Sequence, residues 1–403
     1  MIRDAALRTA VAACMLAAVV LFRGDALARA GDLFDGDVLQ RIDLRVDPET
    51  WDTLKANFRE DDYYPATLEW SGHAVRNAGI RSRGGGSRNG TKLGMRVDFG
   101  RFSDSQTFLG LRSIVLDNLG QDASGVKERV AMRLYERLGL VVPREAHAQL
   151  YVTGQYLGLY ALVESVDEDF ARRAFGEPGY LFEYEYDTEW FLSYPGPELE
   201  KYRELFDPVT HRRSRLDALY GPLHELLRLV NESRDEEFQA LVGRYLDLPL
   251  FMRHVAAQNF AAQLDGILGY AGVNNFYVYR PEQSPRSQFL AWDEDNAFFA
   301  PDYPILQGHE RNVLMRRAMA VPELRAMYFD SLLAAADAAE RWLEDEIRRQ
   351  RALIRDALQS DDLKPFTNEQ VGEAETRLLD FARTRPEIVR RSVAAARTAS
   401  PRR

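Results

Sequence analysis

The first clear pattern of apolar and polar positions lies shortly before residue 50. Ile42, Leu44 and Val46 alternate with polar residues, which predicts a strand with one buried face. Asp47 and Pro48 follow directly. Because Asp is a preferred helix N-cap and Pro is tolerated at the first helical position, the sequence predicts a strand that passes into a helix.

Further strands are predicted from Ala66 to Phe99, where two alternating arms flank the segment RGGGSRNGTK. The next segment, GVKERVAMRLYERLGL, has apolar residues at helical spacing and predicts a helix that ends near Gly139. The clearest hairpin is EAHAQLYVTGQYLGLYALVESVD, with its turn at Thr153 and Gly154. YLFEYEYDTEWF predicts one more strand.

The second half of the chain is predicted to be mainly helical. Residues 197–275 have mostly helical patterns, and so does the chain from about Val321 to its end. NNFYVYR and SQFLAWD interrupt these helices as a predicted strand pair, joined by the loop PEQSPRS. Strands in the first half and helices in the second indicate an α+β fold, with a sheet-rich lobe over about residues 31–190 and a helical lobe over about 191–398.

The first 30 residues have the pattern of a secretory signal peptide. Two arginines precede an apolar run from about Thr9 to Phe22, and small residues follow at 26–30. The run is short compared with the roughly 20 residues that span a bilayer, so we expect cleavage and not retention as a membrane anchor. On this expectation residues 31–398 form the exported domain, without a stable membrane anchor, and residues 399–403 form a basic tail.

Composition narrows the possible chemistry and partners. Cys14 is the only cysteine in the sequence, and it lies in the middle of the apolar run, which argues against a lipoprotein anchor. A cleaved chain would have no disulfide, no thiol nucleophile and no zinc–thiolate site. The formal net charge of −10 argues against nucleic acid and anionic membranes as partners. The sequence does not define an oligomeric state.

The segment FLAWDEDNAFF places three acids directly after a predicted buried strand. Asp293 follows the second strand of the predicted pair and Asn275 precedes the first, so a hairpin would bring them to the same end. Asp265 ends a helical pattern before this pair. Carboxylate and amide oxygens in such a group favour Mg²⁺, Mn²⁺ or Ca²⁺. The order of these residues resembles that of a protein kinase, in which a catalytic Asp, a metal-binding Asn and a metal-binding Asp follow one another.

Each of these residues also has an ordinary structural interpretation. An Asp after a helix is usually a cap, and an Asn before a strand is usually a turn residue. The segment is not an EF-hand loop, because Ala297 stands where an oxygen ligand is required. The glycine-rich segment from Arg83 to Lys92 could bring backbone N–H groups to phosphate, but such turns are common in sheet proteins. Glu164, at the end of the clearest hairpin, fits a nucleotide site or an ion pair between two elements.

Five segments, in this order along the chain, resemble the CotH kinase family, which is named for a spore-coat protein. They are LFDGDVLQRIDLRVDPETWDTL, AGIRSRGGGSRNGTK, LYVTGQYLGLYALVESVD, NNFYVYR and FLAWDEDNAF. The resemblance implies an atypical protein-kinase-like fold that uses ATP and Mg²⁺ or Mn²⁺. It also implies phosphorylation of Ser or Thr in an extracytoplasmic or coat protein, or in the kinase itself.

The resemblance assigns roles to single residues. Asp265 matches the family's catalytic aspartate. Asp293 matches the metal-binding aspartate of its W-D-x-D motif, and Asn275 matches the Asn before the F/Y-x-x-Y strand, a second metal ligand. Asp295 is the second acid of the motif, either a further ligand or a structural partner. Glu164 matches the Glu of Y-x-x-x-E and is expected in the nucleotide site.

One departure from the family pattern concerns phosphate binding. Family members often have N-L-Y-K where this chain has YLFEY, so Glu183 stands in place of the lysine. If that lysine contacts the phosphates of ATP, Lys92 or Arg81 would have to replace it. A glutamate at this position would repel ATP unless a metal ion intervenes.

Three functions therefore stay open at this point. The first is an exported Ser/Thr kinase. The second is a pseudokinase that acts as a binding or structural protein, which is favoured by Glu183 and by export to a compartment with little ATP. The third is a coat or surface protein in which the acids of WDEDN hold structural Ca²⁺. The sequence does not identify the acceptor protein.

Overall fold

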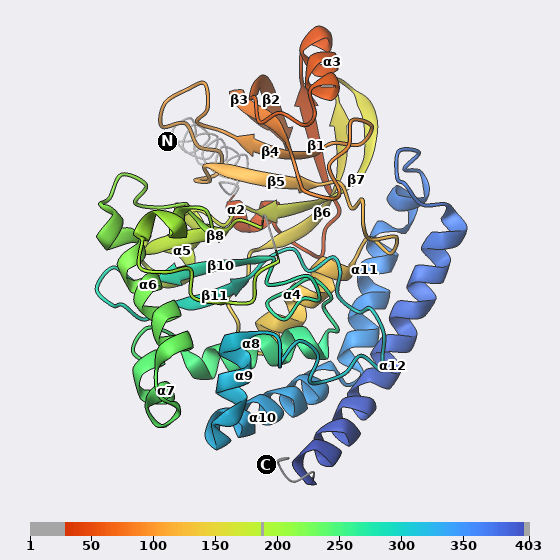
Figure 1. Cartoon of the computed structure of the whole chain (residues 1–403). Coiled ribbons are helices and arrows are strands. Elements are labelled where there is room, and N and C mark those ends of the chain that lie inside the picture. Colours follow the sequence, from red (N-terminus) through yellow and green to blue (C-terminus); the bar gives the residue numbers. More distant parts are fainter. Residues whose placement is uncertain (1–28, 187–188, 399–403) are drawn as a thin grey trace, which may run out of the picture.

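The computed structural model describes residues 29–186 and 189–398. Most of the predicted signal peptide and the predicted basic tail at 399–403 lie outside the described residues. Strands dominate the first part of the described chain and helices the second, as Figure 1 shows. The α+β fold with a sheet-rich N-terminal lobe and a mostly helical C-terminal lobe is therefore confirmed.

In the described part of the chain, seven strands form a closed barrel in the order β1-β2-β3-β4-β5-β7-β6. They are β1 (Gln40–Arg45), β2 (Tyr64–Trp70), β3 (His73–Arg83), β4 (Gly94–Asp98), β5 (Ser113–Asp117), β6 (Glu145–Val152) and β7 (Gln155–Glu164). The barrel closes through a parallel pairing of β1 with β6. Closure leaves no unpaired strand edge, and apolar side chains such as Ile42, Met95 and Leu162 form the core.

The local predictions in this lobe are confirmed. The carboxylate of Asp47 accepts a hydrogen bond from the backbone N–H of Thr50 at 3.1 Å, and Pro48 is the first residue of α3 (Pro48–Ala56). Helix α4 (Lys127–Arg137) ends just before Gly139, which has a φ of +76°. The hairpin of β6 and β7 turns at Thr153 and Gly154, and both residues have positive φ.

A second sheet has the strand order β11-β10-β8-β9. Its strands are β8 (Tyr180–Tyr184), β9 (Phe206–Pro208), β10 (Phe276–Arg280) and β11 (Gln288–Ala291). Strand β9 lies in a region that was predicted to be mostly helical. Three residues are too few to produce a recognisable alternation, and β9 is held in place by its pairing with β8.

The helices cover the second sheet and extend along the side of the barrel. The elements not yet named are α2 (Ala30–Leu33), α5 (Glu168–Phe175), η1 (Leu199–Arg203), α6 (Leu216–Glu232), α7 (Asp235–Val242), α8 (Leu248–Phe260), α9 (Val313–Ala320), α10 (Pro322–Ala339), α11 (Trp342–Gln359) and α12 (Asn368–Thr398). In Figure 1 the barrel lies at the top, the second sheet below it, and α8, α9 and α10 at the bottom. Helices α11 and α12 lie side by side, and α11 contacts β7 of the barrel.

Arg385 of α12 joins the end of α8 to the loop that follows β11. Its side chain is fully buried, and the guanidinium donates hydrogen bonds of 2.6–2.9 Å to backbone carbonyls. The acceptors are the carbonyl oxygens of Asn259, Phe260, Pro301 and Tyr303. These residues lie before Asp265 and after Asp295 in the sequence. Within the described residues, none of the helices is long and apolar enough to span a bilayer.

Candidate active-site cleft

A cleft of about 640 Å³ lies between the barrel and the second sheet. One wall comes from the barrel, with the glycines Gly84–Gly86 after β3 and Asp117 at the end of β5. The other wall comes from the ends of β8, β10 and β11 and the loop before β10. The predicted site residues on this second wall are Asp265, Asn275, Asp293 and Asp295.

Asp265 is held by the two asparagines that precede β10. The side-chain N–H of Asn274 donates to Oδ2 of Asp265 at 3.1 Å. Asn275 donates to the backbone carbonyl of Asp265 at 3.0 Å and to its Oδ2 at 3.4 Å. Burial raises the pKa of the Asp265 carboxyl, and the two asparagine bonds act in the opposite direction. The carboxylate is thus fixed in orientation and partly shielded from water.

The register of the β10–β11 hairpin brings Asn275 and Asp293 to the same end, as the sequence predicted. Phe276 pairs with Ala291, and the N–H of Trp292 donates to the carbonyl of Asn275 at 3.3 Å. Asn275 has a φ of +55° and Asp293 a φ of +54°. Asn and Asp tolerate this left-handed conformation better than most residues, and such strain clusters at functional sites.

The three acids after β11 divide into two groups. Glu294 is fully buried and points away from the cleft, where it accepts hydrogen bonds from Tyr135, Gln258 and Gln263 at 2.8–2.9 Å. Burial raises the pKa of Glu294 to about 7, although these three donors favour its charged form. Asp293 and Asp295 line the cleft. The middle acid therefore ties the loop to α4, α8 and the residues after α8, and the outer two remain available for ligands.

The carboxyls of Asp293 and Asp295 lie close enough to influence each other's pKa. Burial and the neighbouring Asp117 raise the pKa of Asp293. Burial, together with Asp293 and Asp117, raises the pKa of Asp295 to about 10. Like charges this close disfavour ionisation of both carboxyls. A divalent cation would remove that penalty, because it compensates the negative charge of both groups.

The oxygen donors in the cleft fit a divalent cation that is shared with phosphates. Among the described residues, no group of three or more His, Cys, Asp or Glu side chains is arranged to hold a metal ion alone. Mg²⁺ is usually bound by one or two carboxylates together with substrate phosphates and water. Asp293, Asp295 and Asn275 supply carboxylate and amide oxygens of the type that Mg²⁺ and Mn²⁺ prefer.

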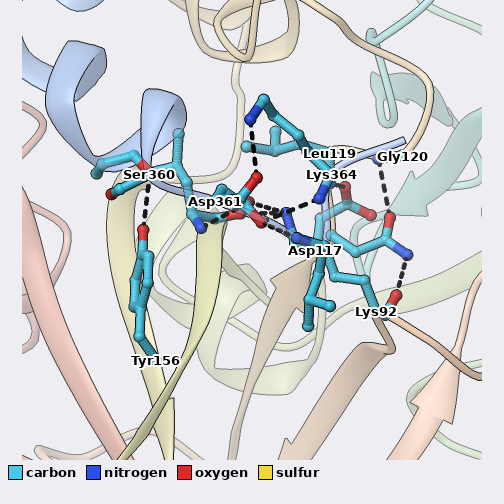
Figure 2. Close-up of polar contacts among 12 residues, drawn as sticks. Lys92, Asp117, Leu119, Gly120, Tyr156, Ser360, Asp361 and Lys364 are labelled. Atoms are coloured by element: carbon cyan, nitrogen blue, oxygen red, sulfur yellow. Dashed lines mark hydrogen bonds and ion pairs between the residues drawn. The ribbon is translucent and has the colours of Figure 1, made fainter. Parts of the chain in front are cut away.

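Lys92 does not line the cleft, and the expectation that it contacts phosphate is corrected. Its side chain is 3% exposed, and Nζ donates to Oδ2 of Asp361 at 2.6 Å and to the carbonyl of Leu159 at 2.8 Å. Figure 2 shows Lys92 and Asp361 in this buried network. The ammonium group is fully engaged between the barrel and the residues after α11.

Glu164 also lies outside the cleft, and its expected place in the nucleotide site is corrected. The side chain is buried and accepts hydrogen bonds from Arg144 at 2.7 Å and from Arg173 at 2.7 and 2.9 Å. Arg144 precedes β6 and Arg173 belongs to α5. Glu164 therefore has the alternative role, an ion pair that joins separate elements.

Arg81 lines the cleft, as expected of a residue near phosphate, but its donors are in use. Its guanidinium donates to Asp61 at 2.7 Å, to the hydroxyl of Tyr63 at 3.2 Å and to the carbonyl of Ser82 at 3.2 Å. It lies at the edge where the cleft adjoins a second cavity of about 930 Å³ on the barrel surface.

Sequence reasoning missed Arg83, Asp117 and Glu128. Asp117 directly follows the apolar run SIVL, just as Asp293 follows FLAW, so the same signal could have identified it. Burial and the carboxyls of Glu145 and Asp293 raise the pKa of Glu128 well above its usual value. No sequence signal marks Glu128, which is buried and does not line the cleft, because only the folded structure brings it near these carboxyls.

Comparisons with known proteins identify one family and one curated relative. A family model described as CotH kinase protein matches residues 80–389. Inner spore coat protein H of Bacillus subtilis (strain 168) is 24% identical over 297 residues, which is 71% of this chain and 78% of that protein.

Two solved structures share low similarity with this chain. A chain from the Shewanella oneidensis MR-1 toxin–antitoxin complex of HipA, HipB and operator DNA has a TM-score of 0.36 and 12% identity, covering 82% of this chain and 66% of that chain. This chain thus spans slightly less than two thirds of it. The proinflammatory kinase CtkA of Helicobacter pylori has a TM-score of 0.34 and 12% identity, covering 75% of this chain and 95% of that chain. Both TM-scores are low, and no feature of this chain is assigned from them.

The matched range of the family model includes the glycine-rich loop, the β10–β11 hairpin and all four predicted residues of the second wall. It covers more than half of the chain, and this protein therefore belongs to the CotH kinase protein family.

Proposed function

We propose that this protein is a CotH-type kinase that transfers the γ-phosphate of ATP to Ser or Thr of a protein substrate. The observation that carries this proposal is the arrangement of Asp265, Asn275, Asp293 and Asp295 on one wall of the cleft, opposite the glycines of the β3–β4 loop. Membership of the CotH kinase family supports it. The acceptor would be a coat or other extracytoplasmic protein, or the kinase itself, and the name of the spore-coat relative supports association with a coat.

In this proposal Asp265 would orient the acceptor hydroxyl and take its proton. Hydrogen bonds from Asn274 and Asn275 fix the direction of its carboxylate. Burial raises its pKa, which makes the carboxylate a better proton acceptor than a fully solvated one. These are the requirements for the catalytic aspartate of a protein kinase, where positioning supplies most of the catalysis.

Asp293 and Asn275 would hold Mg²⁺ or Mn²⁺, with Asp295 as a further ligand or as a structural partner of Asp293. When bound, the cation neutralises charge on the β- and γ-phosphates. Glu294 keeps the two aspartates in place, because its own carboxylate is fixed by three buried donors. The loop can therefore present both aspartates without collapsing.

The β3–β4 loop would cover the phosphates with backbone N–H groups. Gly84 has a φ of +114°, a conformation that other residues rarely adopt. Asn118, which follows β5, anchors the loop: its side-chain N–H groups donate to the carbonyl of Ser87 at 3.0 Å and to that of Lys92 at 2.7 Å. A glycine backbone fixed at this position can approach phosphate oxygens closely.

A second candidate function is that of a catalytically inactive relative that binds other proteins and holds a structural cation such as Ca²⁺. Glu183 favours it, because a half-buried carboxylate lines the cleft where negatively charged phosphates would enter. The two functions differ in one outcome, since only the kinase transfers phosphate. A structural cation would also raise the melting temperature without ATP and lose that effect in chelator.

The test is the intact mass of the purified protein after incubation with Mn²⁺ and ATP, alone and with a coat protein as acceptor. Increments of about 80 Da in the wild type, absent in Asp265→Ala, support the kinase. Asp47→Ala is the matched control, because Asp47 only caps α3, and it should transfer phosphate like the wild type. Absence of increments in all three folded proteins would contradict the proposal and favour the binding function.

We also infer that the chain is exported, and the support for this is the sequence pattern of residues 1–30. Expression with its native N-terminus, followed by determination of the N-terminal residue of the recovered protein, tests the inference. Cleavage close to residue 30 and recovery outside the cytoplasm are expected. An uncleaved chain that stays in the cytoplasm would contradict it.

A further inference from the structure

The cleft is lined by three arginines in the described residues, Arg81, Arg83 and Arg88. The guanidinium groups of two of them, Arg81 and Arg88, already form hydrogen bonds within the protein. Arg81 donates to Asp61 and Tyr63. Arg88 donates at 2.6 Å to the carbonyls of Phe58 and Glu60, and also to Ser82 and Asp61. These bonds hold the loop before β2 against the glycine-rich loop, so neither guanidinium is free to bind a ligand without loss of structure.

Arg83 differs from both of its neighbours. It is the last residue of β3, directly before Gly84, and its side chain is only 19% exposed. Within the described chain its guanidinium forms no hydrogen bond. The nearest carboxylate oxygen, Oδ2 of Asp117, lies 3.7 Å from Nη1, which is too far for a hydrogen bond. Arg83 thus keeps its N–H donors unused in a largely enclosed site.

The surroundings of Arg83 explain why it stays in the cleft. Its guanidinium lies 5.6 Å from the centre of the Trp292 ring, on the ring face. The charged groups that face it are Asp117 from β5, Asp293 after β11 and Glu183 from β8. Burial opposes the charge on Arg83, but these three acids together with Tyr277 more than offset it, so the pKa of Arg83 is raised. The cation is thus held between both walls of the cleft without being hydrogen-bonded to either.

We propose that Arg83 is the residue that binds the phosphates of the nucleotide. This inference rests on the proposed kinase function and adds the phosphate-binding residue to it. A guanidinium presents several N–H donors in one plane and binds phosphate oxygens in a bidentate way, which an ammonium group cannot do. Arg83 adjoins the glycine-rich loop on one side and Asp293 on the other, so phosphates that contact the loop and a cation at Asp293 also reach Arg83.

Glu183 is compatible with nucleotide binding when Arg83 balances its charge. Glu183 faces Arg83 from β8, so its charge is balanced within the cleft before a nucleotide enters. When phosphates approach, they compete with Glu183, Asp117 and Asp293 for the same guanidinium. Arg83 therefore exchanges one set of negative partners for another and does not become a buried unpaired charge.

The experiment is a calorimetric titration of the full folded protein with Mn²⁺–ATP and, separately, with adenosine. Arg83→Gln is expected to weaken ATP binding about tenfold or more, the size of a lost charged hydrogen-bond pair, and to leave adenosine binding unchanged. Arg83→Lys keeps the charge without the planar donors and should bind ATP with intermediate affinity. Arg76→Gln is the matched control, because Arg76 is exposed on the same strand, and it should bind like the wild type.

The outcomes separate this inference from the function on which it rests. If the wild type binds ATP and transfers phosphate while Arg83→Gln binds ATP equally well, the phosphate role is overturned and the kinase function stands. If Arg83→Gln or Arg83→Lys weakens the binding of ATP and of adenosine equally, Arg83 has a structural role, and the phosphate role is also overturned. If the wild type neither binds ATP nor transfers phosphate, the proposed function fails and this inference fails with it. Thermal melting checks folding, and Arg83→Lys provides the comparison if Arg83→Gln does not fold.

Discussion

Lys92 and Asp361 form a buried ion pair of 2.6 Å, although 269 positions separate them in the chain. Oδ2 of Asp361 also accepts a hydrogen bond from the backbone N–H of Leu159 at 3.0 Å. Gly158 makes room for this carboxylate, because a Cβ at that position would lie 2.5 Å from both of its oxygens. The pair thus connects β7 and the β3–β4 region of the barrel to the residues after α11, as Figure 2 shows.

Lys92→Met is expected to lower the free energy of unfolding by about 3–5 kcal/mol, because it leaves the carboxylate of Asp361 buried without its cation. Urea denaturation at neutral pH measures the loss. The matched control is Lys55→Met, which removes a Lys–Asp pair of 2.8 Å with Asp52 on the surface of α3. It should have a much smaller effect. Equal losses in the two variants would show that the buried pair does not hold the lobes together.

Glu294→Ala is expected to destabilise the protein by about 3 kcal/mol or more, because it leaves the buried donors of Tyr135, Gln258 and Gln263 without an acceptor. Thermal melting and urea denaturation measure this loss. Mn²⁺ titration of the folded variant should also show weaker binding, since Asp293 and Asp295 flank this position. Glu294→Gln keeps one acceptor oxygen and should lose less stability. A Glu294→Ala protein as stable as the wild type would refute the structural role.

The buried histidine His147 should make stability depend on pH. Its Nε2 lies 2.7 Å from the carbonyl of Gly125, and its Nδ1 has no hydrogen-bond partner among the described residues. Burial lowers the pKa of His147 from 6.5 to about 4. Between these two values the unfolded chain binds a proton that the folded protein excludes, so stability falls as the pH decreases from 6.5 towards 4.

The free energy of unfolding of the wild type should fall when the pH is lowered from about 7 to about 5. In His147→Gln this fall is expected to be smaller by about 2 kcal/mol. Glutamine does not titrate and can still donate to the carbonyl of Gly125. Urea denaturation at the two pH values gives the difference. His73→Gln, at the exposed first residue of β3, is the control and should leave the difference unchanged. An unchanged difference in His147→Gln would exclude His147 as a source of acid sensitivity.

Glu183→Gln is expected to tighten Mn²⁺–ATP binding by about fivefold. The substitution removes one half-buried negative charge from the cleft, and the repulsion of the phosphates should fall by about 1 kcal/mol. Calorimetric titration provides the measurement. Glu204→Gln, an exposed residue outside the cleft, has the same charge change and should bind ATP like the wild type. Weaker binding in Glu183→Gln would mean that Glu183 positions Arg83 and does not merely repel phosphate.

Much of the site could be predicted because its residues are tied to local patterns. Asn275 and Asp293 flank two alternating strands with a short connection, and the hairpin register alone brings them together. Asp265 lies ten positions before Asn275, so its contact with that residue is also local. The roles of these residues in phosphate transfer stay predictions until the mass measurement is made.

The residues placed wrongly have partners that are distant in the sequence or hidden from pattern analysis. The position of Lys92 on the glycine-rich segment suggests contact with phosphate, but its partner, Asp361, follows the end of α11. Glu164 is the last residue of its strand, as Asp117 is of β5. Its carboxylate, however, pairs with two arginines that do not line the cleft. A single sequence carries no information on which of these strand ends faces the cleft.

The sequence by itself determined the α+β division, the main strands and helices, and the group of oxygen donors at the end of one hairpin. Periodicity and turn residues decide these features, and they act over a few residues. The tertiary structure decided which charged groups face the cleft and which are buried ion pairs. Of the arginines that line the cleft in the described part of the chain, it left Arg83 with unused donors. Burial and pairing depend on elements that meet only when the barrel, the second sheet and the C-terminal helices pack together.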